Sequence, residues 1–122
     1  MRSRSGLRLF EDIAENIGRI RRYARGYDAA RFAGDEMCQD AVEHCLLRIS
    51  EAARLLGDMA DRHAPSIPWR DVRGIGNHLR HEYQKVNVNL IWRVVERDLT
   101  DLSSAVETAI ATLRQERTDR DR

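Results

Sequence analysis

Apolar residues recur every three or four positions through most of the chain, a spacing that predicts helices rather than strands. The first such run covers residues 7–26 and the second covers residues 35–63, with a connector between them that has room for one helical turn. Residues 66–83 carry a third, weaker pattern, and residues 90–113 carry a fourth that we expect to bend at residues 98–101. Four amphipathic helices with short connections predict an all-α, up-and-down four-helix bundle.

Polar residues at helix starts and the chain length define the organisation further. Asp35 can cap the second helix, and Asn87 or Asn89 can cap the fourth. The chain has 122 residues and shows neither a repeat nor a linker, so we expect a single domain over residues 1–122. Residues 113–122 alternate in charge without an apolar anchor, and we expect them to fray into a tail.

Composition indicates a globular protein and leaves the ligand open. Hydrophobic residues make up 42% and charged residues 34% of the chain, which argues against disorder. The formal net charge of +1 supplies no global electrostatic case for nucleic acid. Lys85 is the only lysine, so the positive charge is nearly all arginine, which suits bidentate phosphate contacts but also fits a GC-rich genome.

Cysteine usage and the leftover apolar residues bear on location and assembly. Cys38 and Cys45 lie about two turns apart on one helix face, too far for a mutual disulfide, so we expect reduced, buried thiols. The sequence shows no signal peptide and no segment long enough to span a bilayer, so we expect a cytoplasmic protein without membrane contact. In a bundle this small, Ile91 and Trp92 look like spare apolar surface, which suggests a homodimer.

Candidate chemistry is concentrated in residues 73–83. Two histidines with a carboxylate could bind a metal, but His78 and His81 are three residues apart instead of four, and we expect neither a metal nor another cofactor. Residues 74–76 read Gly-Ile-Gly, yet they follow no strand and lack a third glycine, which excludes a dinucleotide loop. The side chains that remain of interest are those of Arg73, Asn77, His78, Arg80, His81, Glu82 and Tyr83.

Metal-independent RNA cleavage fits these groups. A ribose 2′-OH attacks the neighbouring phosphate, so one group must accept a proton and another must protonate the leaving oxygen, and histidine does both near neutral pH. His81 can fill this role, with Arg80 and Asn77 stabilising the charge on the phosphoryl oxygens. From the residues alone, polar contacts at a surface or an interface are the favoured explanation for His81 and Arg80.

Several segments resemble the HepT-like branch of the HEPN superfamily. They are Ile67–Val72, His81–Tyr83, Val88–Leu99 and the second-helix residues 35–53, and the resemblance extends over most of residues 7–115. It implies an all-helical homodimer with the motif at the interface, acting as the ribonuclease toxin of a toxin–antitoxin pair. The implied partner is a minimal nucleotidyltransferase antitoxin, called MntA in this family.

The family motif is an arginine, four residues, a histidine, one residue and a tyrosine. His81 matches the histidine, and Tyr83 matches the tyrosine that the antitoxin modifies with AMP. Gly76 stands where the arginine belongs, and Arg80, or less favourably Arg73, is the candidate substitute. We expect His78, Glu82 and Arg73 to support the site. The alternative is a non-catalytic helical partner, or a substrate-binding subunit, of a minimal nucleotidyltransferase.

Overall fold

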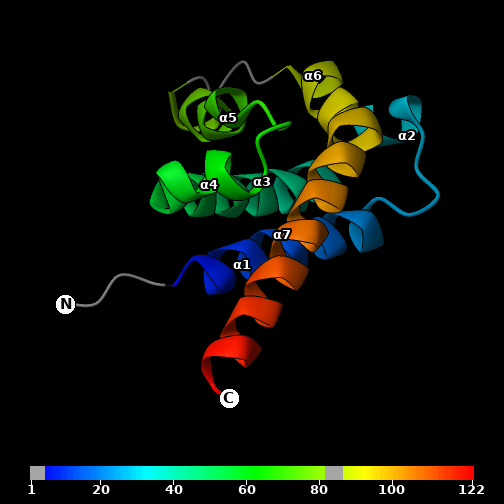
Figure 1. Ribbon diagram of the computed structural model, residues 1–122. Coiled ribbons are helices and arrows are strands. Elements are labelled where there is room, and N and C mark those ends of the chain that lie inside the picture. The colour runs from blue at the N-terminus through cyan, green and yellow to red at the C-terminus, as the bar shows by residue number, and fades with distance from the viewer. Residues whose placement is uncertain (1–4, 82–86) are drawn as a thin grey trace.

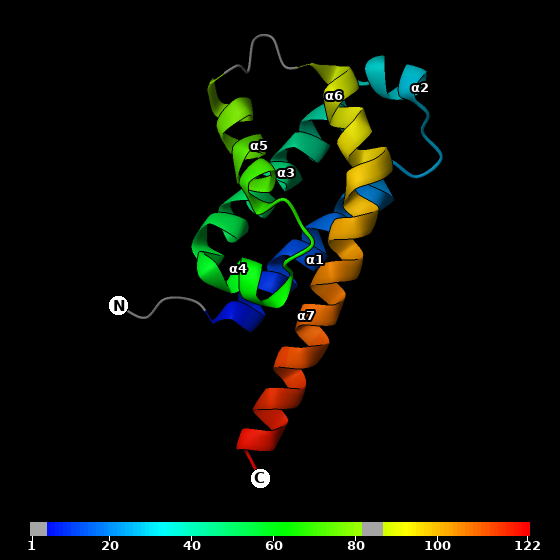
Figure 2. The same ribbon diagram turned by 45° about the horizontal axis from the view of Figure 1, so that its top comes forward.

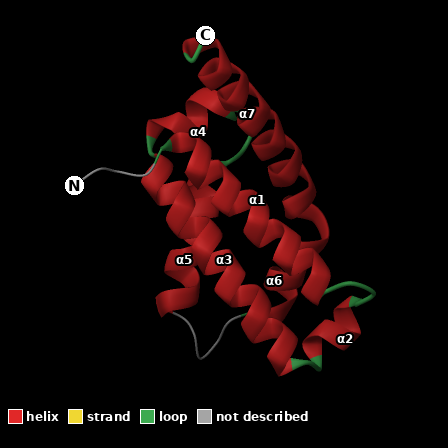
Figure 3. Ribbon diagram, turned by 90° about the horizontal axis from the view of Figure 1, so that it is seen from below, coloured by secondary structure: helices red, strands yellow, loops and turns green. Residues whose placement is uncertain are grey.

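Helices account for nearly all of the chain that the structure, a computed structural model, describes: residues 5–81 and 87–122, without the side chains of residues 80 and 81. Within those ranges no residue is in a strand (Figure 3), so the expected all-α class is confirmed. The elements are α1 (Gly6–Tyr23), α2 (Ala29–Ala33), α3 (Glu36–Leu56), α4 (Asp58–His63), α5 (Trp69–His81), α6 (Val88–Arg93), the π-helix η2 (Val94–Asp98) and α7 (Leu99–Arg120).

The longer helices form a bundle in which α3 occupies a central place. One side of α3 packs on α1 and the other on α5, and α1 in turn packs on α7. The elements α6, η2 and α7 follow one another as a single long rod that crosses α1 (Figures 1 and 2). The bundle therefore consists of α1, α3, α5 and this rod, with α2 and α4 as short connecting turns.

The second predicted helix is two helices in the structure. Gly57 ends α3 with a φ of 53° and a ψ of −132°, a conformation that essentially only glycine adopts. The chain restarts at once as α4. The sequence pattern predicted one helix over residues 35–63 because the apolar period continues across the break, while the glycine redirects the backbone.

The C-terminal element also differs from its prediction. In place of a bend at residues 98–101, the wider turn of η2 leads into α7 without interruption. Beyond Leu113 the residues are exposed, as the missing apolar anchor indicated, yet the helix continues to Arg120 instead of forming an irregular tail. The Gln115 side chain donates a hydrogen bond to the Asp119 carboxylate at 3.1 Å, and the Thr118 hydroxyl donates to the Arg114 carbonyl oxygen at 3.0 Å, each one turn away. The segment is also rich in good helix formers.

Two predicted caps are confirmed. The Asp35 carboxylate accepts a hydrogen bond from the Cys38 backbone N–H at 3.0 Å at the start of α3. At the start of α6 the Asn87 side chain accepts from the backbone N–H groups of Asn89 and Leu90, so Asn87 is the cap. Since the first N–H groups of a helix lack partners within it, these bonds fix where each helix begins.

The apolar side chains of the bundle meet in one core, and it includes residues that the sequence placed on the surface. Ile91 is 4% exposed, and Trp92 packs against Phe32 with ring centroids 5.2 Å apart, so the expectation that these two form spare surface is wrong. Both cysteines are buried and free, which confirms that prediction. No helix within the described ranges is both long and apolar enough to cross a membrane. The largest fully buried side chains are Trp69, Phe10, Phe32, Ile13, Ile17, Ile20, Leu46, Ile49, Leu99, Val42 and Val106.

Candidate functional site

The candidate residues lie on α5, and a buried tryptophan anchors the start of that helix. Trp69 is 2% exposed, and its indole N–H donates to the Ala64 carbonyl oxygen at 2.9 Å. Its ring also meets Phe10 of α1 edge-on, with centroids 6.4 Å apart. Tryptophan combines a large apolar surface with one donor, so this side chain ties α5 to the preceding loop and to the core.

A buried serine joins α3 to the middle of α5. The Ser50 hydroxyl is 2.8 Å from the Arg73 carbonyl oxygen, to which it donates, and 3.1 Å from the Gly76 N–H, from which it accepts. Gly76 is itself buried. Position 76, where the family motif has its arginine, therefore faces α3, and its backbone N–H donates to the Ser50 hydroxyl.

Arg73 is engaged with the C-terminal end of α3. Its Nε donates to the Ala53 carbonyl oxygen at 3.1 Å, and a terminal nitrogen donates to the Gly57 carbonyl oxygen at 3.0 Å. The last carbonyl groups of a helix lack partners within it, and a cation is favourable there. The guanidinium group of Arg73 thus holds α3 and α5 together.

A cavity of about 370 Å³ between α3 and α5 is lined by arginine. Arg54 and Arg70 are both exposed, and neither was singled out from the sequence. The Glu51 carboxylate binds Arg54 in a bidentate manner, at 3.1 and 2.6 Å, and this hydrogen bonding raises the pKa of the Arg54 guanidinium above its usual range. The Arg70 side chain makes no hydrogen bond or ion pair with any residue in the described ranges. The cavity is lined by Ser50, Arg54, Arg70, Arg73, Gly74 and Asn77.

The register of α5 bears on position 81, which follows the cavity residues along the helix. Arg70, Gly74 and Asn77 are spaced by four and three residues and so share one face of the helix. His81 follows Asn77 by four residues within the same helix, which puts position 81 one turn further along that face. Position 80 is about 100° away around the axis. The predictions for the side chains of Arg80 and His81 and for Glu82 and Tyr83 fall outside the described residues.

His78 lies elsewhere on α5. It borders a second cavity of about 370 Å³ between α5 and the α6–η2 segment, and this cavity is mostly apolar. Leu90 on its wall is 41% exposed, and Ile75 is half-buried. His78 and Asn77 therefore line different cavities, while Arg70 and Gly74 border both. The remaining apolar residues that line the second cavity are Leu79, Ile91 and Val94.

A larger groove of about 510 Å³ between α1 and α3 lies apart from the candidate residues. Charges of both signs line it, and some of them are in ion pairs: Arg8 lies 3.5 Å from Asp12, and Glu15 lies 2.9 Å from Arg19, which is outside the lining. Within the described residues, no group of three His, Cys, Asp or Glu side chains is placed to hold a metal ion.

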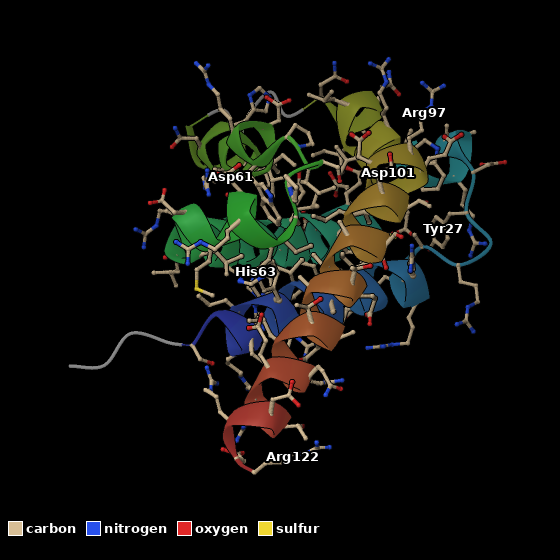
Figure 4. All side chains as sticks on the ribbon, in the orientation of Figure 1. Tyr27, Asp61, His63, Arg97, Asp101 and Arg122 are labelled. Atoms are coloured by element: carbon tan, nitrogen blue, oxygen red, sulfur yellow. The ribbon has the colours of Figure 1, made fainter. Side chains whose placement is uncertain are left out.

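A polar contact with shifted pKa values lies beside α2, across the molecule from α5 (Figures 1 and 4). The Tyr27 hydroxyl donates to Asp35 at 2.6 Å, and the Arg31 guanidinium lies 4.0 Å from the centre of the tyrosine ring. This hydrogen bond raises the pKa of Tyr27. The same bond, and a second one from the backbone N–H of Cys38, lower the pKa of Asp35. Because Asp35 also caps α3, this contact secures the α2 connection.

Comparison with known proteins identifies the family. The HepT-like family model, described as "Ribonuclease HepT-like", matches residues 13–109. The Thermococcus cleftensis protein named "Probable ribonuclease HepT" is 34% identical over 97 residues, which cover 80% of this chain and 88% of that protein. A Methanocaldococcus jannaschii protein whose name describes an RNase is 28% identical over 96 residues, covering 79% and 88%. No solved structure matches the chain.

The helical bundle, with its polar motif at the end of α5, is that of a HEPN-type protein. Because the family model covers most of the chain, the chain belongs to the HepT-like ribonuclease family. This confirms the resemblance stated from the sequence.

Proposed function

We propose that this protein is the endoribonuclease toxin of a HepT/MntA-type toxin–antitoxin pair and that His81 is its catalytic histidine. The observation that supports this most directly is the register of α5, which puts position 81 on the same helix face as Asn77 and the arginine-lined cavity. Family membership and relatives named as ribonucleases support the choice of RNA as substrate.

In the proposed reaction no metal takes part. His81 accepts the proton of a ribose 2′-OH as its oxygen attacks the adjacent phosphorus, and the bond to the 5′ oxygen of the next nucleotide breaks. The leaving oxygen takes a proton from an imidazolium, and the products are a 2′,3′-cyclic phosphate and a 5′-OH. The amide of Asn77 and an arginine stabilise the charge that develops on the phosphoryl oxygens.

Arg80 is the proposed replacement for the motif arginine. Arg73 is disfavoured because its guanidinium already donates to the carbonyl oxygens of Ala53 and Gly57 at the end of α3. Gly76, at the position of the motif arginine, has no side chain to contribute. Since position 80 is about 100° from position 81, we assign Arg80 to the active site of a partner subunit across a dimer interface.

The proposed homodimer uses the apolar cavity between α5 and α6–η2. Leu90 is exposed on its wall, where a second copy would cover it. Leu90→Glu is therefore expected to shift the protein to a monomer in light scattering coupled to gel filtration. Leu55→Glu is the matched control, because Leu55 is 47% exposed on α3 and lines the groove on the other side of the bundle. Equal effects of both variants, or of neither, would contradict this interface.

Cleavage is tested with purified protein and single-stranded RNA. Wild type is expected to cleave and His81→Ala to lose cleavage by at least about a hundredfold, the contribution typical of a general acid–base group. His44→Ala is the control, because His44 is exposed on α3 and accepts a hydrogen bond from Arg48. If wild type and His81→Ala leave the RNA equally intact, the nuclease proposal fails.

Neutralisation is proposed to occur by adenylylation of Tyr83 by an MntA-like nucleotidyltransferase. Attached phosphate would repel RNA phosphates from the arginine-rich face and obstruct the site. Intact mass after incubation with that enzyme and ATP is expected to rise by AMP, and Tyr83→Phe is expected to abolish the increase. No increase in wild type would contradict the proposal.

The second candidate function is a non-catalytic partner of the nucleotidyltransferase, and Gly76 favours it because the motif arginine is missing at that position. The RNA cleavage and adenylylation experiments together distinguish the nuclease from the non-catalytic partner. Adenylylation at Tyr83 without any RNA cleavage by unmodified protein would support the partner role.

A further inference from the structure

Arg54 and Arg70 come from different helices and converge on one cavity. Arg54 lies in the last turn of α3 and Arg70 in the first turn of α5, and both line the same space of about 370 Å³. They are sixteen positions apart in the chain, so only the packing of α3 on α5 brings them together. Asn77 adds an exposed amide to the same wall.

The cavity is suited to an anionic ligand. Its charged lining residues are all arginines, and the Glu51 carboxylate, which binds Arg54, is not among the lining residues. Glu51 binds the Arg54 fork in a bidentate manner, the geometry in which arginine also holds a phosphate, so a phosphate at Arg54 competes with Glu51 for these donors. Arg70 has no partner in the described ranges and can donate to a ligand without breaking a contact.

Phosphate on a polymer fits better than a small anion. Gly74 lies exposed in the cavity wall between Arg70 and Asn77, and a Cβ built on it meets nothing within 4 Å, so the face of α5 is unobstructed at this position. From residue 74 to residue 81 the helix rises by about 10 Å. A single RNA strand bound at position 81 and lying along this face would bring a neighbouring phosphate to the arginines.

We propose that Arg54 and Arg70 form a phosphate subsite that holds the RNA backbone a few nucleotides from the bond to be cleaved. The proposal rests on the proposed ribonuclease function and extends it. The two arginines act in binding, on a phosphate that does not react, and they position the strand against α5. Arg73 forms the floor of the subsite while its donors remain on α3.

The experiment measures binding separately from cleavage. A short fluorescein-labelled 2′-O-methyl oligoribonucleotide cannot be cleaved by 2′-OH attack, and its binding is followed by fluorescence anisotropy. Replacing both arginines, in Arg54→Gln/Arg70→Gln, is expected to weaken binding about tenfold. The slope of log K against log salt is expected to become shallower by about 0.7, since the subsite holds one phosphate and each single-strand phosphate contact contributes about 0.7.

The matched control is Arg25→Gln/Arg117→Gln. It removes the same charge from exposed arginines in the connector before α2 and on α7, away from the cavity. Binding by this variant is expected to stay within about twofold of wild type. Circular dichroism and urea unfolding verify that both double variants fold; only small stability changes are expected because the Glu51–Arg54 pair is exposed.

Four results would each overturn the subsite. The first two are equal losses in the two double variants and an unchanged salt slope in Arg54→Gln/Arg70→Gln. The third is competition by polyglutamate as strong as by RNA, which would indicate a surface for acidic protein, and the fourth is absence of RNA binding by wild type. If wild type binds the 2′-O-methyl strand through these arginines but does not cleave ordinary RNA, the nuclease function fails while the subsite stands.

Discussion

Two glycines with open surroundings allow a matched test of how backbone conformation affects stability. Gly74 lies within α5 with a helical backbone, and Gly57 ends α3 with a φ of 53°. A Cβ built on either residue meets nothing within 4 Å. The same substitution, glycine to alanine, therefore adds a methyl group without a clash at both positions, and the backbone conformation alone decides the sign of the effect.

The magnitudes follow from helix propensity and from φ. Gly74→Ala is expected to raise the free energy of unfolding by about 1 kcal/mol, the difference between glycine and alanine inside a helix. Gly57→Ala is expected to lower it by about 1–3 kcal/mol, because an L-residue is strained at that φ and ψ. With an unfolding entropy of about 2.1 cal/mol/K per residue over 122 residues, 1 kcal/mol corresponds to roughly 4 °C in Tm.

Urea unfolding and thermal melts of both variants measure these changes. Low protein concentration keeps association from contributing to the apparent stability. The reasoning is refuted if Gly74→Ala is destabilising under these conditions, or if Gly57→Ala leaves the stability unchanged. A loss of stability in Gly74→Ala that appears only at high concentration would instead show that a second copy covers this face of α5.

Three further predictions concern the core and the titrating groups. Trp69→Phe is expected to lower the free energy of unfolding by about 1–3 kcal/mol in urea, because it removes a buried hydrogen bond and leaves a void. The stability difference between wild type and Tyr27→Phe should depend on pH. The pKa of Asp35 is lowered and that of Tyr27 is raised, so the Tyr27–Asp35 hydrogen bond stabilises the fold from about pH 4 to about pH 10. This stabilisation is lost below and above that window. A stability difference between the two proteins that does not change from pH 3 to 7 would contradict this. Burial raises the pKa of the Cys38 and Cys45 thiols, so iodoacetamide should modify them slowly at neutral pH until the protein is unfolded, which mass spectrometry can follow.

Much of the fold follows from local patterns that any stretch of the sequence carries by itself. Apolar spacing predicted the helices. The cap at Asp35 was predicted correctly, and the cap of the last element was narrowed to Asn87 or Asn89, because such a side chain bonds to backbone only two or three residues away. The burial of both cysteines also followed from their helical face. Residues 73–83 stood out as the candidate site because their chemistry is dense along the chain itself.

Only the tertiary structure decided how individual residues are used. Arg73 looked available for catalysis, yet it donates to carbonyl groups 16 and 20 residues away, and Ser50 reaches the amide of Gly76 across 26 residues. Arg54 and Arg70 share a cavity because α3 packs on α5. Periodicity specifies which face of a helix is apolar, but it carries no information about which neighbouring helix supplies the partner. Contacts between helices therefore had to come from the packed bundle.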